Sequence, residues 1–272
     1  MSLTFIIILI PSCKKIEKDK PQVDFLFSSD DFSVPSVVLF ENKTTNATEY
    51  EWDFGDGTYS KEVNPSKTFT VEGTYSITLT AKGEGGSTSL KKQLVIKSKF
   101  STFNDPRDGQ TYKIVKIGNQ WWFAQNLNYQ TGNSWCYDNN PANCATYGRL
   151  YDWQTAMAAC PNGWHIPSDS EWVQLITYLG GDNLAGGKMK TIAGWDAPNI
   201  NASDSSGFSA LPGGIINSNG FYGIGSVGYW WSSTENGNLF AWDIELRNSS
   251  ESVTRYSFAN KLDGFAVRCV RD

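Results

Sequence analysis

Segments that alternate apolar and polar residues run through the chain from Asp24 to Ile96. They read SVVLFEN, EYEWDFGDG, KTFTVEGTYSITLTAKG and KKQLVIK, and residues typical of turns (Gly, Asn and Pro) lie among them. A period of two places every second side chain on the same face of a β-strand. Short strands at this spacing are typical of a β-sandwich, so we predict an all-β domain in this part of the chain.

Length and composition suggest a second domain and an extracellular setting. Single hydrophobic cores usually stop growing before a length of 272 residues, so two domains are expected. Charged residues make up 19% and aromatic residues 14%, with 25 Gly, a balance that favours a turn-rich extracellular protein. The net charge is −5 and no basic stripe interleaves with aromatic residues, so nucleic acid is not expected as a partner.

The N-terminus resembles a bacterial lipoprotein signal. An apolar run, FIIILI, precedes the tripeptide Pro-Ser-Cys that ends at Cys13, and this run is too short to span a bilayer as a stable helix. We expect residues 1–12 to be a signal peptide and Cys13 to carry the lipid that anchors the protein to a membrane. The expected location is the cell envelope, as an outer-membrane lipoprotein, and either leaflet agrees with the sequence. The alternative is an ordinary signal peptide whose cleavage removes Cys13.

The other cysteines indicate disulfide bonds. There are four of them, an even number in a chain that is expected to be exported: Cys136, Cys144, Cys160 and Cys269. Four cysteines allow three pairings, and their number alone does not choose among them.

A family resemblance covers the first domain, which we place at residues 22–98, after a polar tether at 13–21. The stretch YEWDFGDGTYSKEVNPSKTFTVEGTYSITLTAKGEGGS resembles the PKD domain, an Ig-like module of surface proteins and secreted polysaccharide-degrading enzymes. Trp52 and Phe54 are expected to share one face of a strand, and GDG is expected to form a tight turn with positive φ. For Asp53 and Asp56, turn hydrogen bonds are expected in preference to metal binding.

A second resemblance covers residues 106–272, after a linker at 99–105. The blocks NQWWFAQNLNY, CPNGWHIPSDSEW, SGFSALPGG, YWWSSTE and GFAVRCV resemble, in this order, the Fibrobacter succinogenes major paralogous domain. The resemblance implies an α+β architecture similar to C-type lectin-like and formylglycine-generating-enzyme-like folds, with two helices, a twisted mixed sheet and long loops. The family has no defined activity, so the resemblance implies an architecture more than a function.

Apolar spacing predicts the first helix of this domain and a disulfide pairing. Residues that recur at steps of three and four are expected on its buried face: Leu150, Trp153, Met157 and Cys160. Cys269 is expected to face the core from the last strand, together with Phe265 and Val267. Because the helix and the strand each present a cysteine inward, we predict the bridge Cys160–Cys269, which leaves Cys136–Cys144 as the second.

A capping box predicts the second helix, which starts after Ser168 with Glu171 at the third position and ends at Gly180-Gly181. Its expected apolar face consists of Trp172, Leu175, Ile176 and Leu179. The only histidine, His165, lies between the two helices. With Cys160 oxidised and no second histidine in the sequence, His165 has neither a thiolate to activate nor a partner in a histidine-rich zinc site. We therefore expect a packed, hydrogen-bonded His165.

The sequence offers little support for an enzyme. It contains no G-x-S-x-G, Walker or H-E-x-x-H motif. Formylglycine-generating relatives of the fold use a reactive cysteine pair near the end of the chain and bind copper, whereas Cys269 is the only cysteine in the C-terminal third. We expect no catalytic residue, metal or cofactor, and the Glu-Pro-Asn and Trp-Asn-Asp motifs of calcium-dependent lectins are absent. A glycan-active enzyme with paired Asp and Glu leaves little trace in a sequence and stays the enzymatic alternative.

A tethered binding or adhesion module is the expected function, with an Ig-like spacer presenting a lectin-like head to an extracellular glycan or protein. Sugars are commonly held by aromatic faces and by Asn, Asp and Glu side chains. The expected ligand residues lie in the loops around YWWSSTE: Asn217, Asn219, Phe221, Tyr222, Glu235 and Asn236. Within YWWSSTE, Trp230 or Trp231 must face inward, because neighbours on a strand point to opposite faces. The alternative is an architectural surface or complex subunit without a ligand of its own.

Overall fold

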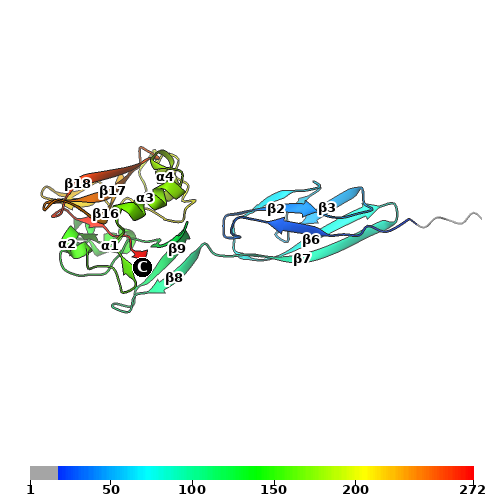
Figure 1. Cartoon of the computed structure of the whole chain (residues 1–272), viewed down its shortest axis with the longest axis horizontal. Helices are drawn as coiled ribbons and strands as arrows, with labels where there is room; N and C mark the ends of the chain where they lie inside the picture. Colours follow the sequence, from blue (N-terminus) through cyan, green and yellow to red (C-terminus); the bar gives the residue numbers. More distant parts are fainter. Residues whose placement is uncertain (1–17) are drawn as a thin grey trace, which may run out of the picture. The chain divides into compact units, whose positions relative to one another are not determined.

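The computed structural model describes residues 18–272, which divide into two compact units at the junction of Ser98 and Lys99 (Figure 1). The expected signal peptide and Cys13 lie outside the described residues, so their roles stay predictions. No helix of the described part is long and apolar enough to cross a membrane.

The first unit, up to Ser98, is built from a three-stranded and a four-stranded antiparallel sheet. The strands are, in sheet order, β1 (Phe25–Ser28), β2 (Ser36–Asn42) and β5 (Ser66–Phe69), then β4 (Tyr59–Ser60), β3 (Glu49–Asp53), β6 (Gly73–Gly83) and β7 (Gly86–Ile96). Trp52 and Phe54 are both buried in the same aromatic and aliphatic core, as the alternation predicts. The all-β prediction for this domain is confirmed.

The GDG turn of the first unit has the predicted backbone, with φ of 75° at Gly55 and 84° at Gly57. Asp53 Oδ1 accepts a hydrogen bond from the N–H of Gly55 at 2.9 Å. Asp56 Oδ1 accepts from the N–H of Thr58 at 3.0 Å and from its hydroxyl at 2.6 Å. Both carboxylates therefore make the turn hydrogen bonds expected from the sequence.

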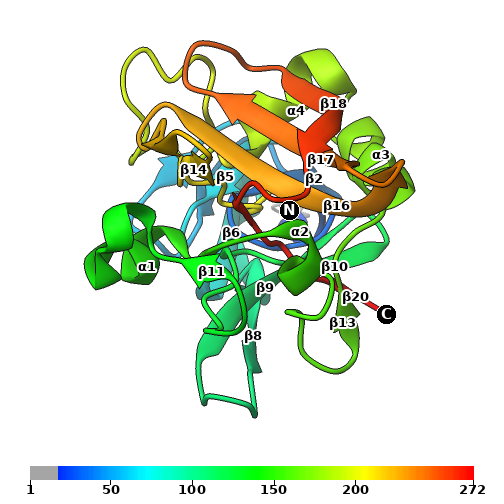
Figure 2. The same cartoon turned by 90° about the vertical axis from the view of Figure 1, so that its left-hand side faces the viewer.

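The second unit, from Lys99, has three sheets and a few helices (Figure 2). Its five-stranded sheet runs β13 (Trp164–His165), β20 (Val270–Arg271), β10 (Gln120–Phe123), β9 (Thr111–Ile117), β8 (Phe100–Asn104). Its six-stranded sheet runs β11 (Ser134–Trp135), β12 (Leu150–Tyr151), β19 (Phe265–Ala266), β16 (Val227–Asn236), β17 (Phe240–Arg247), β18 (Val253–Asn260), and β14 (Ile215–Asn217) pairs with β15 (Gly220–Tyr222). The six-stranded sheet is mixed, because β16 and β19 run parallel while its other neighbours run antiparallel.

The helices of the second unit differ in part from the prediction. They are the single turn η1 (Tyr137–Asn139), α1 (Pro141–Tyr147), α2 (Trp153–Ala156), α3 (Asp169–Tyr178) and α4 (Asp182–Met189). The second predicted helix is confirmed as α3, with the capping box of Ser168 and Glu171 and a buried apolar face. The first predicted helix is wrong, because Leu150 lies in β12 and α2 ends before Met157, which is 42% exposed.

The linker prediction also needs correction. Residues 100–104 of the expected linker form β8, which pairs with β9 along its whole length. Phe100 and Phe103 anchor this strand, because each packs against a hydrophobic core of the second unit. Strand β9 is joined to β10 by a tight hairpin turn at Gly118-Asn119, with Gln120 opposite Ile117.

Sheet β16–β18 separates two cores. Trp230 and Trp231 are both fully buried, Trp230 in the core beneath α3 and α4 and Trp231 in the core that contains Tyr151 and Phe265. The sequence required one of these tryptophans to face inward, and the structure buries both because each face of the sheet is covered. The helices that cover the Trp230 face are visible beside β17 and β18 in Figure 2.

Candidate functional site

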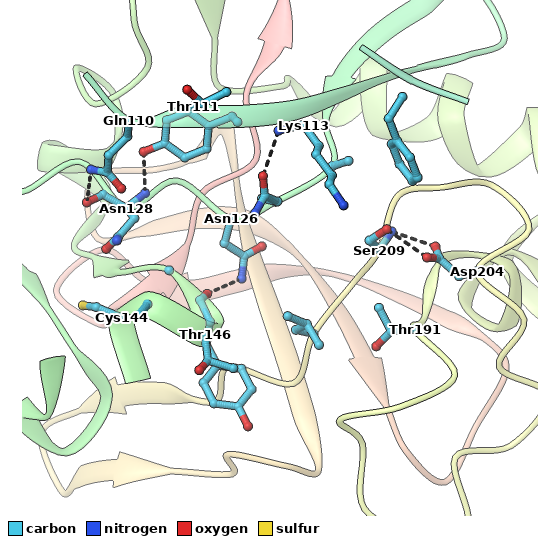
Figure 3. A pocket seen from close by; sticks show the side chains of 18 residues that line it. Gln110, Thr111, Lys113, Asn126, Asn128, Cys144, Thr146, Thr191, Asp204 and Ser209 are labelled. Carbon is cyan, nitrogen blue, oxygen red and sulfur yellow. Dashed lines mark hydrogen bonds between the residues drawn. The ribbon is translucent and has the colours of Figure 1, made fainter. Parts of the chain in front are cut away.

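A polar cavity of about 370 Å³ lies in the second unit, and we call it the polar cleft (Figure 3). Its walls come from β8, β9, the segment 124–128 after β10, α1 and the segment 191–211. Figure 3 shows Gln110 and Asn128 on one side of the cleft and Asp204 and Ser209 on the other. Its volume lies within the range of about 300–1,000 Å³ that is typical of ligand pockets.

Helix α1 forms one wall of the cleft because local signals begin and end it there. Asn140 Oδ1 accepts a hydrogen bond from the N–H of Ala142 at 3.0 Å, and Pro141 occupies the first turn. Gly148, with φ of 76°, ends the helix, and a Cβ at this position would lie 2.6 Å from Cβ of Asn126. This close approach places Tyr147 beside the segment 124–128 in the cleft lining.

Several polar side chains of the cleft have hydrogen-bonding groups that are not used by the described residues. Gln125 Oε1 accepts from the N–H of Lys113 at 2.8 Å, whereas its Nε2 has no hydrogen bond to the described residues. The side-chain amide of Asn128 likewise has no hydrogen bond to the part of the chain that the structure describes, since only its backbone is bonded. Lys113 Nζ lies 5.5 Å from the ring centre of Phe100 and forms no ion pair within residues 18–272. The cleft therefore offers an amino group, two amides and aromatic faces.

A buried polar pair supports the floor of the cleft. Asn126 Oδ1 accepts hydrogen bonds from Trp230 Nε1 at 2.8 Å and from Arg268 Nε at 2.6 Å, and Asn126 Nδ2 donates to the carbonyl of Tyr147 at 2.7 Å. Arg268 is 1% exposed, and burial lowers the pKa of its guanidinium to about 9. Its other donors bond the carbonyls of Phe123, Phe208 and Ser209. Asn126 and Arg268 therefore join the last strands to α1 and to the far wall.

The far wall is a short loop that includes Asp204 and Ser209. Ser209 has a φ of 53°, a left-handed conformation that is costly for a residue other than Gly or Asn. The two oxygens of Asp204 accept hydrogen bonds from the N–H and the hydroxyl of Ser209, both at 2.8 Å. Burial raises the pKa of Asp204, and these two hydrogen bonds oppose the rise. The hydrogen bonds from Ser209 to Asp204 and from Arg268 to the carbonyl of Ser209 thus hold the loop in this strained conformation.

The ligand residues predicted from the sequence lie elsewhere and are not brought together. Asn217, Asn219, Phe221 and Tyr222 belong to the β14–β15 hairpin, where the N–H of Asn219 donates to Asn217 Oδ1 at 2.9 Å and Tyr222 is 62% exposed. Phe221 packs on Tyr137, with ring centres 5.2 Å apart. The hairpin is a structured turn that holds one largely exposed aromatic side chain.

Glu235 and Asn236 lie at the opposite end of β16 from this hairpin. Gly214, just before the hairpin, pairs with Gly228 near the start of β16, and seven residues at about 3.3 Å each put Glu235 roughly 20 Å away. Glu235 is ion-paired with Lys261 at 3.0 Å, and Asn236 Nδ2 donates to the carbonyl of Ser257 at 2.8 Å. The structure therefore does not bring the six predicted residues together, because the length of β16 separates the hairpin from Glu235 and Asn236.

The structure contains both bridges expected from the sequence, Cys136–Cys144 and Cys160–Cys269. Cys144 belongs to α1 and lines the polar cleft, so the short bridge joins that wall to the segment before η1. Cys269 is fully buried in the core that also holds Phe265 and Val267, as the strand pattern predicts.

His165 lies in the short strand β13, beside β20 and away from the polar cleft lining. Its Nδ1 lies 2.6 Å from Asp272 Oδ1 and its Nε2 lies 2.9 Å from Glu171 Oε1. Burial lowers the pKa of His165, but the hydrogen bonds to Asp272 and Glu171 outweigh it and leave the pKa above its ordinary value. Both ring nitrogens have protein partners, so the ring is fixed against the capping box of α3.

The sequence patterns did not indicate the polar cleft, because its lining comes from segments that are far apart in the chain and individually unremarkable. The block NQWWFAQNLNY was singled out for its family resemblance, and its residues Gln125, Asn126 and Asn128 are all in the cleft lining. Among the described residues, no group of three His, Cys, Asp or Glu side chains is arranged to hold a metal ion.

Comparison with known proteins places both domains in families. A model of the Fibrobacter succinogenes major domain matches residues 115–271, and a model of the PKD domain matches residues 19–97. Collagenase ColA of Bacillus cereus is 38% identical over 68 residues, 25% of this chain and 7% of the collagenase. Pre-pro-metalloprotease PrtV of Vibrio cholerae is 32% identical over 79 residues, 29% of this chain and 9% of that protein. The chain thus spans less than a tenth of these relatives, and the matches cover only its PKD part.

Two solved structures are also similar to the chain. The PKD1 domain of the Vibrio cholerae metalloprotease PrtV is 27% identical, with 29% of this chain and 100% of that domain covered at a TM-score of 0.27. A structure of carbohydrate-binding modules from the β-sandwich superfamily is 11% identical, with 94% and 93% covered at a TM-score of 0.30. These scores are too low to carry an argument about fold or ligand. The family model that covers more than half of the chain shows that it belongs to the Fibrobacter succinogenes major domain family, with a PKD domain ahead of that domain.

Proposed function

We propose that the second unit binds an extracellular glycan in the polar cleft. The observation that supports this proposal is the combination, in one cavity, of the rings of Tyr147 and Phe100 with the ligand-ready groups of Lys113, Gln125 and Asn128. A sugar ring has apolar C–H faces that suit aromatic rings and a rim of hydroxyls that suit amides and amines. A small number of polar groups at fixed positions gives a ligand pocket its specificity.

Binding without catalysis is the proposed role of the cleft. Its one cysteine, Cys144, is in a disulfide, so it offers no thiolate. Asp204 is the one acidic residue in its lining, and a glycosidase of the usual type needs two carboxyl groups flanking the bond that is cleaved. The proposal therefore treats the cleft as a recognition site.

The setting of this site is also part of the proposal. We infer that the protein is a lipoprotein acylated at Cys13 in the outer membrane, that the PKD domain acts as a spacer, and that the second unit is a variant of the C-type lectin-like architecture. A mixed sheet covered by helices and followed by long loops, as between Lys190 and Gly214, supports that architecture. Fold analogy alone is a weak warrant for function, so the glycan proposal depends on the cleft.

The test is a glycan and extracellular-matrix protein array probed with the full chain, first with calcium and then with a chelator. We expect binding to a subset of glycans that does not need calcium. The variant Lys113→Ala/Gln125→Ala/Asn128→Ala is expected to lose this binding.

The matched control is Phe221→Ala/Tyr222→Ala/Glu235→Ala, which alters the residues predicted from the sequence and is expected to bind like the unchanged protein. Loss in this control together with retention in the cleft variant would move the site to the β14–β15 hairpin. Binding to matrix proteins alone would replace the glycan with a protein ligand, and no binding at all would favour the architectural role.

A further inference from the structure

The polar cleft adjoins a second cavity. This second cavity has a volume of about 480 Å³, and its lining includes Asp108, Gln130 and Arg149, which do not line the polar cleft. The two cavities share four lining residues, one just before β9, one in the segment after β10 and two of α1: Gln110, Asn128, Cys144 and Ala145. Because these four residues line both cavities, the two cavities are neighbours; we call the four residues the junction and the two cavities together the groove.

One side chain at the junction has hydrogen-bonding groups that no described residue uses. Gln110 Nε2 donates to the carbonyl of Asn128 at 3.2 Å and to the carboxylate of Asp108, so the Gln110 side chain is fixed across the junction. The side-chain amide of Asn128 has no hydrogen bond to the described chain and lines both cavities. The two N–H donors and the carbonyl acceptor of this amide are thus presented where the two cavities meet.

The wall of the junction is rigid. Cys144 Sγ is bonded to Cys136, and Arg149 Nη1 lies 3.6 Å from each of the two sulfurs. Arg149 also donates through Nε to Ser134 Oγ and through Nη2 to the carbonyl of Ser134, both at 3.0 Å. A wall held by a disulfide and a multiply bonded guanidinium loses little entropy when a ligand binds, which favours affinity.

We propose that the ligand is a linear oligosaccharide of two or more sugar residues that lies along both cavities and crosses the junction at Asn128. This proposal rests on the proposed glycan-binding function and specifies its ligand class. Each cavity is large enough to receive a ligand by itself. A monosaccharide fills one cavity and leaves the other hydrated, whereas a longer chain gains the polar groups of both.

The test measures affinity against chain length. The full chain is titrated with gluco-, manno-, xylo- and galacturono-oligosaccharides of one to six residues by NMR and calorimetry. At least one series should show Kd falling about tenfold or more from the monosaccharide to the trisaccharide and then levelling, as one or two added hydrogen bonds require.

Single variants locate the two halves of the groove. Tyr147 lies in the polar cleft alone, so Tyr147→Ala should weaken binding at every length. Gln130 lies in the second cavity alone, so Gln130→Ala should spare the monosaccharide and weaken the disaccharide and longer chains. Asn128→Ala should weaken the trisaccharide about tenfold. Gln174→Ala, an exposed glutamine on α3, controls for the Gln130→Ala change and should have no effect.

The outcomes separate this proposal from the function it rests on. Equal affinity at all lengths, with no effect of Gln130→Ala but a loss in Tyr147→Ala, would overturn the groove and leave a one-cavity glycan site standing. Binding at no length in any series, while the array of glycans is also negative, would overturn the glycan function itself.

Discussion

Arg268 shows how a single buried residue organises the candidate site. On an alternating strand it should point away from the face that holds Val267 and Cys269, which in a one-sided sheet means toward solvent. The chain is instead covered on both sides, so Arg268 is 1% exposed and bonds only carbonyls and the amide of Asn126. Alternation along a strand distinguishes its two faces but does not show what covers each of them.

Removal of the Arg268 guanidinium should destabilise the second unit strongly. Arg268→Met keeps roughly the length of the side chain but removes its hydrogen bonds to four acceptors, of which Asn126 Oδ1 keeps the bond from Trp230 Nε1. We therefore expect a loss of about 3 kcal/mol or more in the free energy of unfolding. Urea denaturation measures this value. Arg271→Met, an exposed neighbour in β20, is the control and should cost less than about 0.5 kcal/mol. A loss below about 1 kcal/mol for Arg268→Met would contradict the supporting role.

Asp243, on β17, carries a second prediction at this scale. It is 1% exposed, and neither of its carboxylate oxygens has a hydrogen-bond partner among the described residues. Burial and the charge of Glu245 raise the pKa of Asp243 to about 8. Between the ordinary pKa of about 3.9 and pH 8 the folded protein keeps a proton that the unfolded chain has lost, so the contribution of Asp243 to stability falls as the pH rises through this range.

Asp243→Asn should remove that pH dependence. The amide has the same shape and no charge, so we expect the variant to be more stable than the unchanged protein at pH 7 by about 2 kcal/mol, with a smaller difference at pH 5. Urea titrations at pH 5, 6, 7 and 8 measure the difference, and Asp138→Asn, an exposed residue of η1, is the control. A constant difference at all four pH values would contradict the raised pKa.

At the scale of elements, local signals predicted some structures well and others poorly. The capping box of Ser168 and Glu171 and the paired glycines after Leu179 lie within α3 or close to its ends in the sequence, and this helix was predicted with its buried face. The spacing of Leu150, Trp153 and Met157 also suggested a helix, but Leu150 pairs with Ala266 in a sheet and only one turn of helix follows. A strand partner more than a hundred residues away is invisible to local spacing.

The two disulfides should differ in their contribution to stability. The Cys160–Cys269 bridge spans 109 residues and the Cys136–Cys144 bridge spans 8. The chain-entropy model gives roughly 5 kcal/mol for the long loop and roughly 2.5 kcal/mol for the short one. Denaturation of the two double alanine variants compares them, and a larger loss for Cys136→Ala/Cys144→Ala would contradict the model.

At the scale of the whole molecule, the two domains were recognisable because their motifs are local blocks of sequence. WDFGDG and NQWWFAQNLNY each lie within a dozen residues, and both families are shown by the models that match them. The polar cleft was not recognisable, because its lining runs from Phe100 to Leu211 and becomes one surface only after β8–β10, α1 and the far loop have packed. The sequence prediction instead followed the asparagines and aromatic residues of the β14–β15 hairpin, because they are adjacent in the chain.

The proposed lipid anchor makes a prediction for the intact protein. Cys13→Ala should move the protein from the detergent phase to the aqueous phase in a temperature-induced phase separation of cell membranes, because the acyl chains supply the membrane affinity. The variant Cys136→Ala/Cys144→Ala keeps Cys13 and controls for the general loss of cysteine, so it should stay in the detergent phase. Retention of Cys13→Ala in the detergent phase would contradict the anchor.

The central claim, that a glycan binds in the polar cleft, is tested most directly by hydrogen–deuterium exchange of the full chain. Exchange is compared without ligand and with a saturating amount of an oligosaccharide selected on the array. The account predicts slower exchange in the cleft-lining segments 110–113, 124–128 and 144–148, and unchanged exchange in residues 215–222 of the β14–β15 hairpin. Protection of the hairpin with no change in the cleft segments would contradict it.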